Sequence, residues 1–194
     1  MNSTAYAKLI KDLQKAKPAI VSEVYVPKLK YLCVAGKSTP GSNDFIDAIG
    51  NIYGTAYTIK FMPRSGVDIP GYTPGYPVGA MLASYDKLEK GWDWQMMLPV
   101  PDFVDDKVIG LATEQLAKKN KPHGRVKLKE IEFGNCAQLM HVGPYDKEQD
   151  DIKLLNDYLA AKGKKMTEHI EIYISDPNRV TAEKRKTIIR YPYK

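Results

Sequence analysis

Cysteine and histidine are scarce in this sequence, which removes the usual signatures of disulfide-rich and metal-binding proteins. Only 2 cysteines and 3 histidines occur among 194 residues. Cys33 and Cys136 lie far apart in the chain, a spacing that gives neither a disulfide framework nor a zinc motif. His123, His141 and His169 show no local ligand spacing either. We therefore interpret both cysteines as buried thiols and expect no metal site and no cofactor.

Long apolar runs are also missing. No stretch approaches the roughly 18 to 20 apolar residues that a membrane span needs. Lysines interrupt every apolar stretch near the start of the chain, so this segment lacks the apolar region of a secretory signal. These lysines are Lys8, Lys11, Lys15 and Lys17. We expect a protein that stays in the cytoplasm and has no membrane partner.

The charge balance alone does not indicate a nucleic-acid-binding protein. Lys and Arg number 29 against 23 Asp and Glu, which gives a formal net charge of +6. The lysines are scattered over the polar faces of expected helices, and no helix-turn-helix, zinc finger or RNA-binding signature accompanies them. We expect no direct nucleic-acid binding.

Familiar catalytic motifs are absent as well. There is no Gly-x-Ser-x-Gly elbow and no His-Glu-x-x-His. Gly36-Lys37-Ser38 ends like a phosphate-binding loop, but the glycine that should precede it at the proper spacing is missing. Any function must therefore come from residues that the fold brings together.

The pattern of apolar residues predicts helices and strands in a repeated order. In the first part we expect an N-terminal helix and then a strand, strand, helix, strand, strand unit. The expected elements are helix 3–17, strands 20–26 and 29–35 forming a hairpin, a helix from Ser42 or Asn43 to Met62, and strands 78–85 and 92–100.

A connecting helix over 105–119 leads to a second unit with the same order. Its expected elements are strands 126–133 and 136–142, a helix between a capping box at Asp146 and Gln149 and a stop at Gly163, and strands 168–175 and 187–191.

The repeat predicts an α+β fold made of a duplicated unit of a four-stranded antiparallel sheet plus one helix. We expect a single domain over 1–194, with a first half over about 20–102 and a second half over about 125–193. Each helix covers one sheet face, so we expect the other face to be buried by its twin. The sequence therefore predicts a pseudo-twofold arrangement with a central cleft, a common place for a ligand pocket.

The strand that begins at Glu168 contains the most informative alternation. Side chains of a strand alternate between two faces, so His169, Glu171 and Tyr173 share one face and the isoleucines between them share the other. We expect the isoleucines to contact the helix after Asp146 and Glu171 to face the cleft. The alternation is equally typical of a strand with one solvent-facing side, and the pattern alone slightly favours that interpretation.

Two tryptophans share one face of the strand 92–100. Trp92 and Trp94 could form a flat apolar platform for a ligand, or they could pack in the core, and the sequence leaves both interpretations open. Aromatic walls around a carboxylate suit a flat cationic ligand through stacking and cation-π attraction.

Several phrases of the second half resemble the GyrI-like small-molecule-binding family, and the resemblance extends over nearly the whole chain. The phrases are Cys136–Tyr145, Glu171–Pro177 and Lys186–Pro192, with upstream likeness in Pro99–Val104, in the Trp92-x-Trp94 strand and in Ala56–Met62. The resemblance implies a tandem repeat, a central cleft and recognition of amphipathic, often cationic drugs and dyes. Some stand-alone relatives hydrolyse cyclopropane-bearing genotoxins.

The resemblance implies roles for particular residues. Glu171 matches the family's central acidic residue, and Trp94 and Tyr145 match aromatic positions of its motifs. On this basis we expect Glu171 to face the ligand, together with Trp94 and Tyr145. Strand alternation adds Trp92, His169 and Tyr173 to the expected site.

The sequence departs from close relatives at two places. Ile170 stands where many have a second histidine, and the strand from Pro77 to Leu82 lacks their acid and tryptophan.

Three functions follow from these expectations. The leading interpretation is binding and sequestration of xenobiotic small molecules. The alternative is a hydrolase that opens cyclopropane-bearing genotoxins in the same site, with Glu171 as general base and Tyr145 as its catalytic partner. A third possibility is an inhibitor that binds a protein partner, for which the sequence contains no signature.

Overall fold

The computed structural model describes residues 2–194, which form two compact units. Of these, unit 1 consists of residues 2–10, 29–79 and 85–131, and unit 2 of residues 11–28, 80–84 and 132–194. Four α-helices and eight strands occur within the described residues. None of the helices between residues 2 and 194 is both long and apolar enough to cross a membrane.

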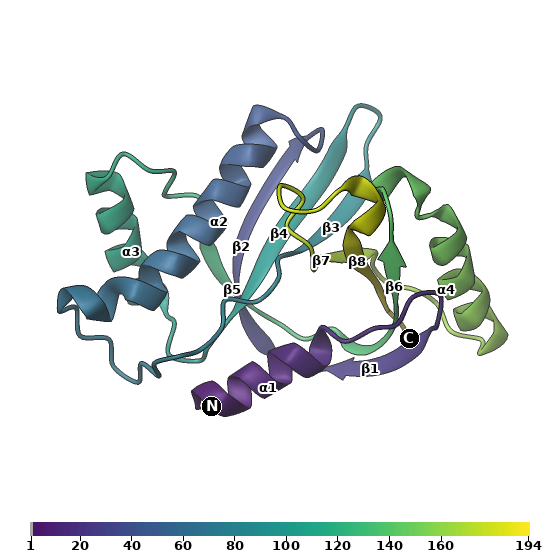
Figure 1. The fold of residues 1–194 in the computed structure, drawn as a ribbon, viewed down its shortest axis with the longest axis horizontal. Coiled ribbons are helices and arrows are strands. Elements are labelled where there is room, and N and C mark those ends of the chain that lie inside the picture. The colour runs from purple at the N-terminus through teal and green to yellow at the C-terminus, as the bar shows by residue number, and fades with distance from the viewer. Residues whose placement is uncertain (1) are drawn as a thin grey trace. The chain divides into compact units, whose positions relative to one another are not determined.

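Unit 1 places one long helix against antiparallel strands (Figure 1). Strand β2 pairs with β4 on one side and with β5 on the other. Helix α2 packs on β2 and β4, and α3 packs on α2. The elements of this unit are β2 (Leu29–Ser38), α2 (Asn43–Phe61), β4 (Trp92–Val100), α3 (Asp106–Lys118) and β5 (Lys127–Ile131).

Helix α2 forms where the sequence predicts it, for reasons that are visible at its start and along its length. The Ser42 hydroxyl accepts a hydrogen bond from the Phe45 N–H at 3.3 Å, which caps the first turn. The buried side chains recur at helical spacing and form the face that covers the strands. They are Phe45, Ala48, Asn51, Ile52, Thr55, Ala56 and Ile59.

Unit 2 repeats this construction. Its strands follow the order β1-β6-β8-β7-β3, and α4 packs on β6 and β8. The elements are β1 (Ser22–Val26), the start of β3 (Leu82–Lys87), β6 (Gly134–Val142), α4 (Gln149–Ala161), β7 (Ile170–Tyr173) and β8 (Lys186–Pro192). The first helix, α1 (Ser3–Leu13), has its start in unit 1 and its end in unit 2. All strand pairs within the units are antiparallel. The predicted α+β fold with a repeated unit is confirmed.

The hairpin predicted at the start of the first half is wrong, and the corresponding strands of the second half take other partners too. Strand β1 pairs with β6, with Val24 opposite Cys136, and β5 pairs with β2, with Leu128 opposite Leu32. Each unit therefore takes its outer strand from the other half of the chain. The link Pro27-Lys28 explains the first error, because a two-residue hairpin turn favours positive φ at its first residue and proline is locked near −65°.

The predicted capping box of α4 is also wrong. Asp146 lies in the short 3₁₀ turn η2 (Tyr145–Lys147), and the residue before α4 is Glu148, whose side chain makes no capping bond. The Ile152 N–H donates to the Glu148 carbonyl at 2.9 Å, so Glu148 contributes its backbone carbonyl, and not its carboxyl, to the start of α4.

The predicted faces of β7 are reversed. Residues that lie opposite each other in a sheet share a face, and Glu171 lies opposite Ile189. Ile189 packs in one cluster with Leu155 and Leu159 of α4, so Glu171 lies on the helix-covered face.

The isoleucines of β7 belong to the other face of the sheet. Ile170 lies opposite Arg190, whose guanidinium donates to the carbonyl of Leu13 at the end of α1. The expectation that Ile170 and Ile172 contact α4 is therefore wrong, because α4 packs on the face of the sheet that carries Glu171.

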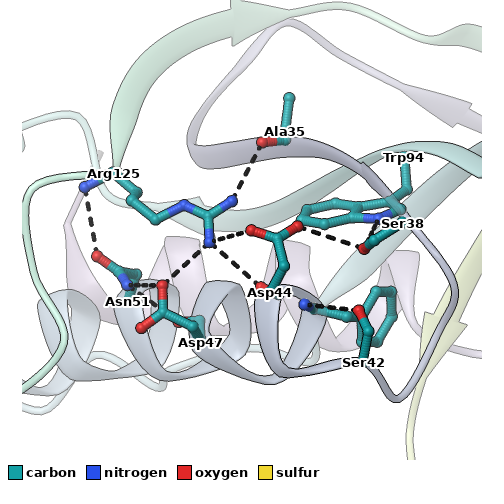
Figure 2. Close-up of polar contacts among 9 residues, drawn as sticks. Ala35, Ser38, Ser42, Asp44, Asp47, Asn51, Trp94 and Arg125 are labelled. Atoms are coloured by element: carbon teal, nitrogen blue, oxygen red, sulfur yellow. Dashed lines mark hydrogen bonds and ion pairs between the residues drawn. The ribbon is translucent and has the colours of Figure 1, made fainter.

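The segment before β5 is joined to α2 by a polar cluster centred on Arg125 (Figure 2). Its guanidinium pairs with Asp44 at 2.9 Å and with Asp47 at 3.0 Å. The Arg125 N–H donates to the Asn51 side chain at 3.3 Å, and Asn51 in turn donates to Asp47 at 3.1 Å. This cluster fixes the start of the exchanged strand β5 on the helix of unit 1.

Candidate functional site

The carboxylate of Glu171 is held from both sides by the residues two positions before and after it in the chain. The Nε2 atom of His169 lies 3.1 Å from one oxygen, and the Tyr173 hydroxyl donates to the other at 2.8 Å. The Glu171 side chain is 17% exposed, so solvent or a ligand can still reach it. No Lys or Arg of residues 2–194 forms an ion pair with it. The site therefore presents an oriented carboxylate without a permanent cationic partner.

His169 links this carboxylate to the core of unit 2. Its Nδ1 atom lies 3.2 Å from the hydroxyl of Tyr191, a side chain that packs in the cluster beneath α4. A neutral imidazole satisfies both contacts when Nε2–H donates to Glu171 and Nδ1 accepts from the tyrosine. A continuous series of hydrogen bonds then runs from Tyr191 through His169 to Glu171.

Tyr145 forms an aromatic side of the site. Its ring lies edge-on to Tyr173, with ring centres 5.8 Å apart, and the Arg185 guanidinium lies 5.2 Å from the Tyr145 ring centre. Burial raises the pKa of Tyr145, and the negative charges of Glu171 and Glu148 add to this rise although Arg185 opposes it. Burial likewise raises the pKa of Tyr191 to about 12. Both hydroxyls stay protonated at neutral pH and can donate hydrogen bonds.

The loop that carries Tyr145 is fastened to the sheet and to α4 by His141. The Nδ1 atom of this buried histidine lies 2.7 Å from Asp151, and Nε2 lies 3.1 Å from the carbonyl of Pro144. Gly143, between them, has a φ of +149°, and a Cβ there would lie 3.2 Å from His141 Nε2. This close approach favours glycine at the point where the strand leads into the site loop.

Sequence reasoning missed Glu148, which the structure places in this group. The side chain is 3% exposed, and its Oε1 atom has no hydrogen-bond partner among the described residues. Burial raises its pKa to about 8, and the negative charges of Glu171 and Asp151 contribute to the rise. The sequence contained no signal for this residue, because a glutamate before a polar helix turn is normally solvated.

The structure thus brings together four of the six predicted site residues within unit 2. They are Tyr145, His169, Glu171 and Tyr173. Trp92 and Trp94 belong to unit 1. Their role as walls of a ligand site stays a prediction.

Trp94 packs in unit 1 beneath α2. It is 1% exposed, and its indole N–H donates to the Ser38 hydroxyl at 3.0 Å (Figure 2). Its ring lies edge-on to Phe45, with ring centres 5.3 Å apart. Gly36 lies opposite it, where a Cβ would approach the indole to 2.4 Å. Trp92 is half-buried and lies edge-on to Tyr85.

Comparisons with known proteins agree with this construction. The family model of the GyrI-like small molecule binding domain matches residues 100–194. The crystal structure of a hydrolase from Listeria innocua is 30% identical, with a TM-score of 0.90 over 97% of this chain and 98% of that chain. The chain belongs to the GyrI-like family. A search of curated protein sequences found no match.

Two further solved structures show the range of this GyrI-like fold. An uncharacterized conserved protein from Listeria innocua is also 30% identical, with a TM-score of 0.89 over 97% of this chain and 98% of that chain. The EcmrR C-terminal domain is 17% identical, with a TM-score of 0.55 over 90% of this chain and 97% of that domain. At that identity the likeness to EcmrR concerns the fold alone.

Proposed function

We propose that this GyrI-like protein binds and sequesters amphipathic, cationic small molecules such as drugs and dyes at the Glu171 site. The observation that carries the proposal is the Glu171 carboxylate, oriented by His169 and Tyr173 and not paired with any Lys or Arg of residues 2–194. A carboxylate that is mostly withdrawn from water and lacks a cationic partner gains most from a ligand that brings the cation.

The surroundings of Glu171 favour a flat ligand. Tyr145 and Tyr173 lie edge-on to one another beside the carboxylate, so a planar cation can contact a ring and the charge together. The two hydrogen bonds that Glu171 accepts use one site on each oxygen, and an ionised carboxylate has about four such sites. A ligand cation can therefore pair with Glu171 without displacing His169 or Tyr173.

The substitution Glu171→Gln tests the charge while it preserves the size of the side chain. We expect the affinity for ethidium, a permanent monocation, to fall by roughly 5- to 150-fold, or about 1 to 3 kcal/mol, because a partly buried charge pair is lost. The affinity for phenanthridine, the neutral parent ring system, should change little. Fluorescence titrations of both dyes measure the difference, with the exposed Glu89→Gln as a matched control.

The salt dependence of the ethidium affinity distinguishes a buried ion pair from an exposed one, since salt screens an exposed pair more strongly. Equal binding of both dyes to wild type and Glu171→Gln would show that Glu171 has no part in ligand recognition.

Hydrolysis is the second candidate function, and the Tyr145 and Glu148 environment favours it. A site that contains one oriented carboxylate and one buried carboxyl with a raised pKa has the groups for base and acid catalysis. In this version Glu171 takes a proton from water as the water oxygen bonds to a carbon of a cyclopropane conjugated to a carbonyl. The strained C–C bond breaks, its electron pair moves to the carbonyl oxygen, and Tyr145 donates a hydrogen bond to the developing oxyanion.

Product analysis distinguishes the two candidates. Mass spectrometry of a cyclopropane-bearing substrate after incubation shows the addition of one water if the protein is a hydrolase, and an unchanged compound if it only binds. Loss of the product with Glu171→Gln would then assign the base. The 30% identical hydrolase from Listeria innocua makes this assay worth running on the present protein.

A further inference from the structure

Glu148 is the buried acid of unit 2 that has no ordinary structural role. Its side chain is 3% exposed, it does not cap α4, and one of its oxygens has no partner among the described residues. A polar atom that is buried without a hydrogen bond destabilises the fold, unless a bound group supplies the missing partner. It lies at the end of the short loop that carries Tyr145, a residue of the proposed ligand site.

The charged and titratable groups that interact electrostatically with Glu148 come from four elements. They are Glu171 of β7, Asp151 of α4, Tyr145 of η2 and Tyr191 of β8. Asp151 is bound by His141 of β6, and Arg185 lies over the Tyr145 ring. No Lys or Arg between residues 2 and 194 forms an ion pair with Glu148, so its immediate charged neighbours are anionic.

We propose that Glu148 is a second carboxyl of the ligand site, which carries a proton in the free protein and releases it when a cation binds beside Glu171. This inference rests on the proposed function, because it needs a cationic ligand at that site. The exchange is balanced: the ligand brings one positive charge, the carboxyl O–H bond breaks, and the proton passes to the buffer. The site thus takes up a cation and releases a proton.

The physical reason lies in what keeps the proton on Glu148. Burial comes first and the charge of Glu171 second, and together they raise the pKa of Glu148 to about 8. A bound cation offsets the charge of Glu171 and also attracts an ionised Glu148 directly. Both effects lower the pKa of Glu148 toward the neutral range or below it, so the proton leaves.

The exchange also assigns a ligand class. The free site holds one ionised and one neutral carboxyl, whereas the bound site can hold two ionised ones. Ligands with a permanent positive charge gain from this second carboxylate, and neutral ligands gain nothing from it. A neutral ligand should therefore bind without any change in protonation.

Calorimetry with ethidium measures the proton directly. Titrations at about pH 7 in phosphate and in Tris, whose heats of ionisation differ, give the number of protons released per ligand bound. We expect the wild-type protein to release about half a proton or more, and Glu148→Gln to release close to none, because the amide does not titrate. Glu89→Gln, at an exposed position, should release as much as wild type.

A second measurement does not depend on a variant that folds. The infrared carbonyl band of a protonated carboxyl should be present in free wild-type protein and should disappear when ethidium is added. Ethidium that binds with no proton release, or with equal release in Glu148→Gln, overturns this inference and leaves the binding function intact. If ethidium does not bind to wild-type protein at all, the proposed function and this inference fail together.

Discussion

Glu148 makes the stability of the protein depend on pH in a direction opposite to that of most carboxylates. Its pKa rises from 4.5 to about 8 on folding, so the folded protein binds this proton more tightly than the unfolded chain does. The resulting stability is fully present below about pH 4.5 and is lost as the pH rises to about 8. The positive end of α4 would favour ionisation, so burial and the anionic neighbours outweigh it.

Glu148→Gln should therefore stabilise the protein at alkaline pH. We expect the variant to gain roughly 2 to 4 kcal/mol over wild type at about pH 8.5 and much less at about pH 5, because only the wild-type carboxyl must ionise. Urea unfolding at the two pH values measures the gain. A difference between variant and wild type that does not vary with pH would show that Glu148 is not a protonated acid in the folded protein.

For single residues, strand alternation correctly predicted which side chains of this segment share a face, but it assigned them to the wrong face of the sheet. His169, Glu171 and Tyr173 do share a face, because a period of two is a property of the backbone. Which face a helix covers depends on the neighbours in the sheet, and Ile189 opposite Glu171 could not be known from β7 alone. Glu148 was missed because burial of an acid in a loop leaves no pattern in the sequence.

The Arg125 cluster shows how one side chain attaches an element of one half to a helix of the other. The guanidinium contacts two aspartates of α2 and the carbonyl of Ala35, although it is 29% exposed and both aspartates are about half exposed (Figure 2). Exposed ion pairs contribute little one by one, but a planar guanidinium that contacts several groups gains geometric specificity.

We expect Arg125→Ala to lower the free energy of unfolding by about 1 to 2 kcal/mol, since several weak contacts are lost together. Arg125→Lys should recover only part of this loss, because Nη1 contacts both aspartates while Nη2 donates to the Ala35 carbonyl, and a single ammonium nitrogen cannot replace both. Chemical denaturation measures the change, with Lys121→Ala as an exposed neighbouring control. A loss for Arg125→Ala no larger than for Lys121→Ala would show that the cluster does not stabilise β5.

At the element scale, helices were easier to predict than strand partners. The start of α2 followed from Ser42 and its apolar spacing, both of which are local. The partners of β1 and β5 lie about a hundred positions away in the chain, such as Cys136 for Val24 and Leu32 for Leu128. A link as short as Pro27-Lys28 suggested a hairpin, and only the chemistry of proline argued against it.

The whole molecule is a repeat in which neither half of the chain contains all the strands of one unit. The strand order β5-β2-β4 of unit 1 corresponds to β1-β6-β8 of unit 2, and the exchanged strands β5 and β1 hold corresponding places. Length, composition and the repeated apolar pattern were sufficient to predict the duplication. The exchange could not be predicted, because equivalent strands of a repeat have interchangeable patterns.

This exchange predicts the behaviour of two fragments cut between Asn120 and Lys121, in the segment after α3. The first fragment lacks β5, and the second lacks β1 and the start of β3, so each leaves a strand edge unpaired and its apolar face incomplete. We expect neither fragment alone to unfold cooperatively, whereas an equimolar mixture should recover a single sigmoidal transition. Urea unfolding followed by circular dichroism measures both. A fragment that folds cooperatively alone would mean that the exchanged strands are dispensable to its unit.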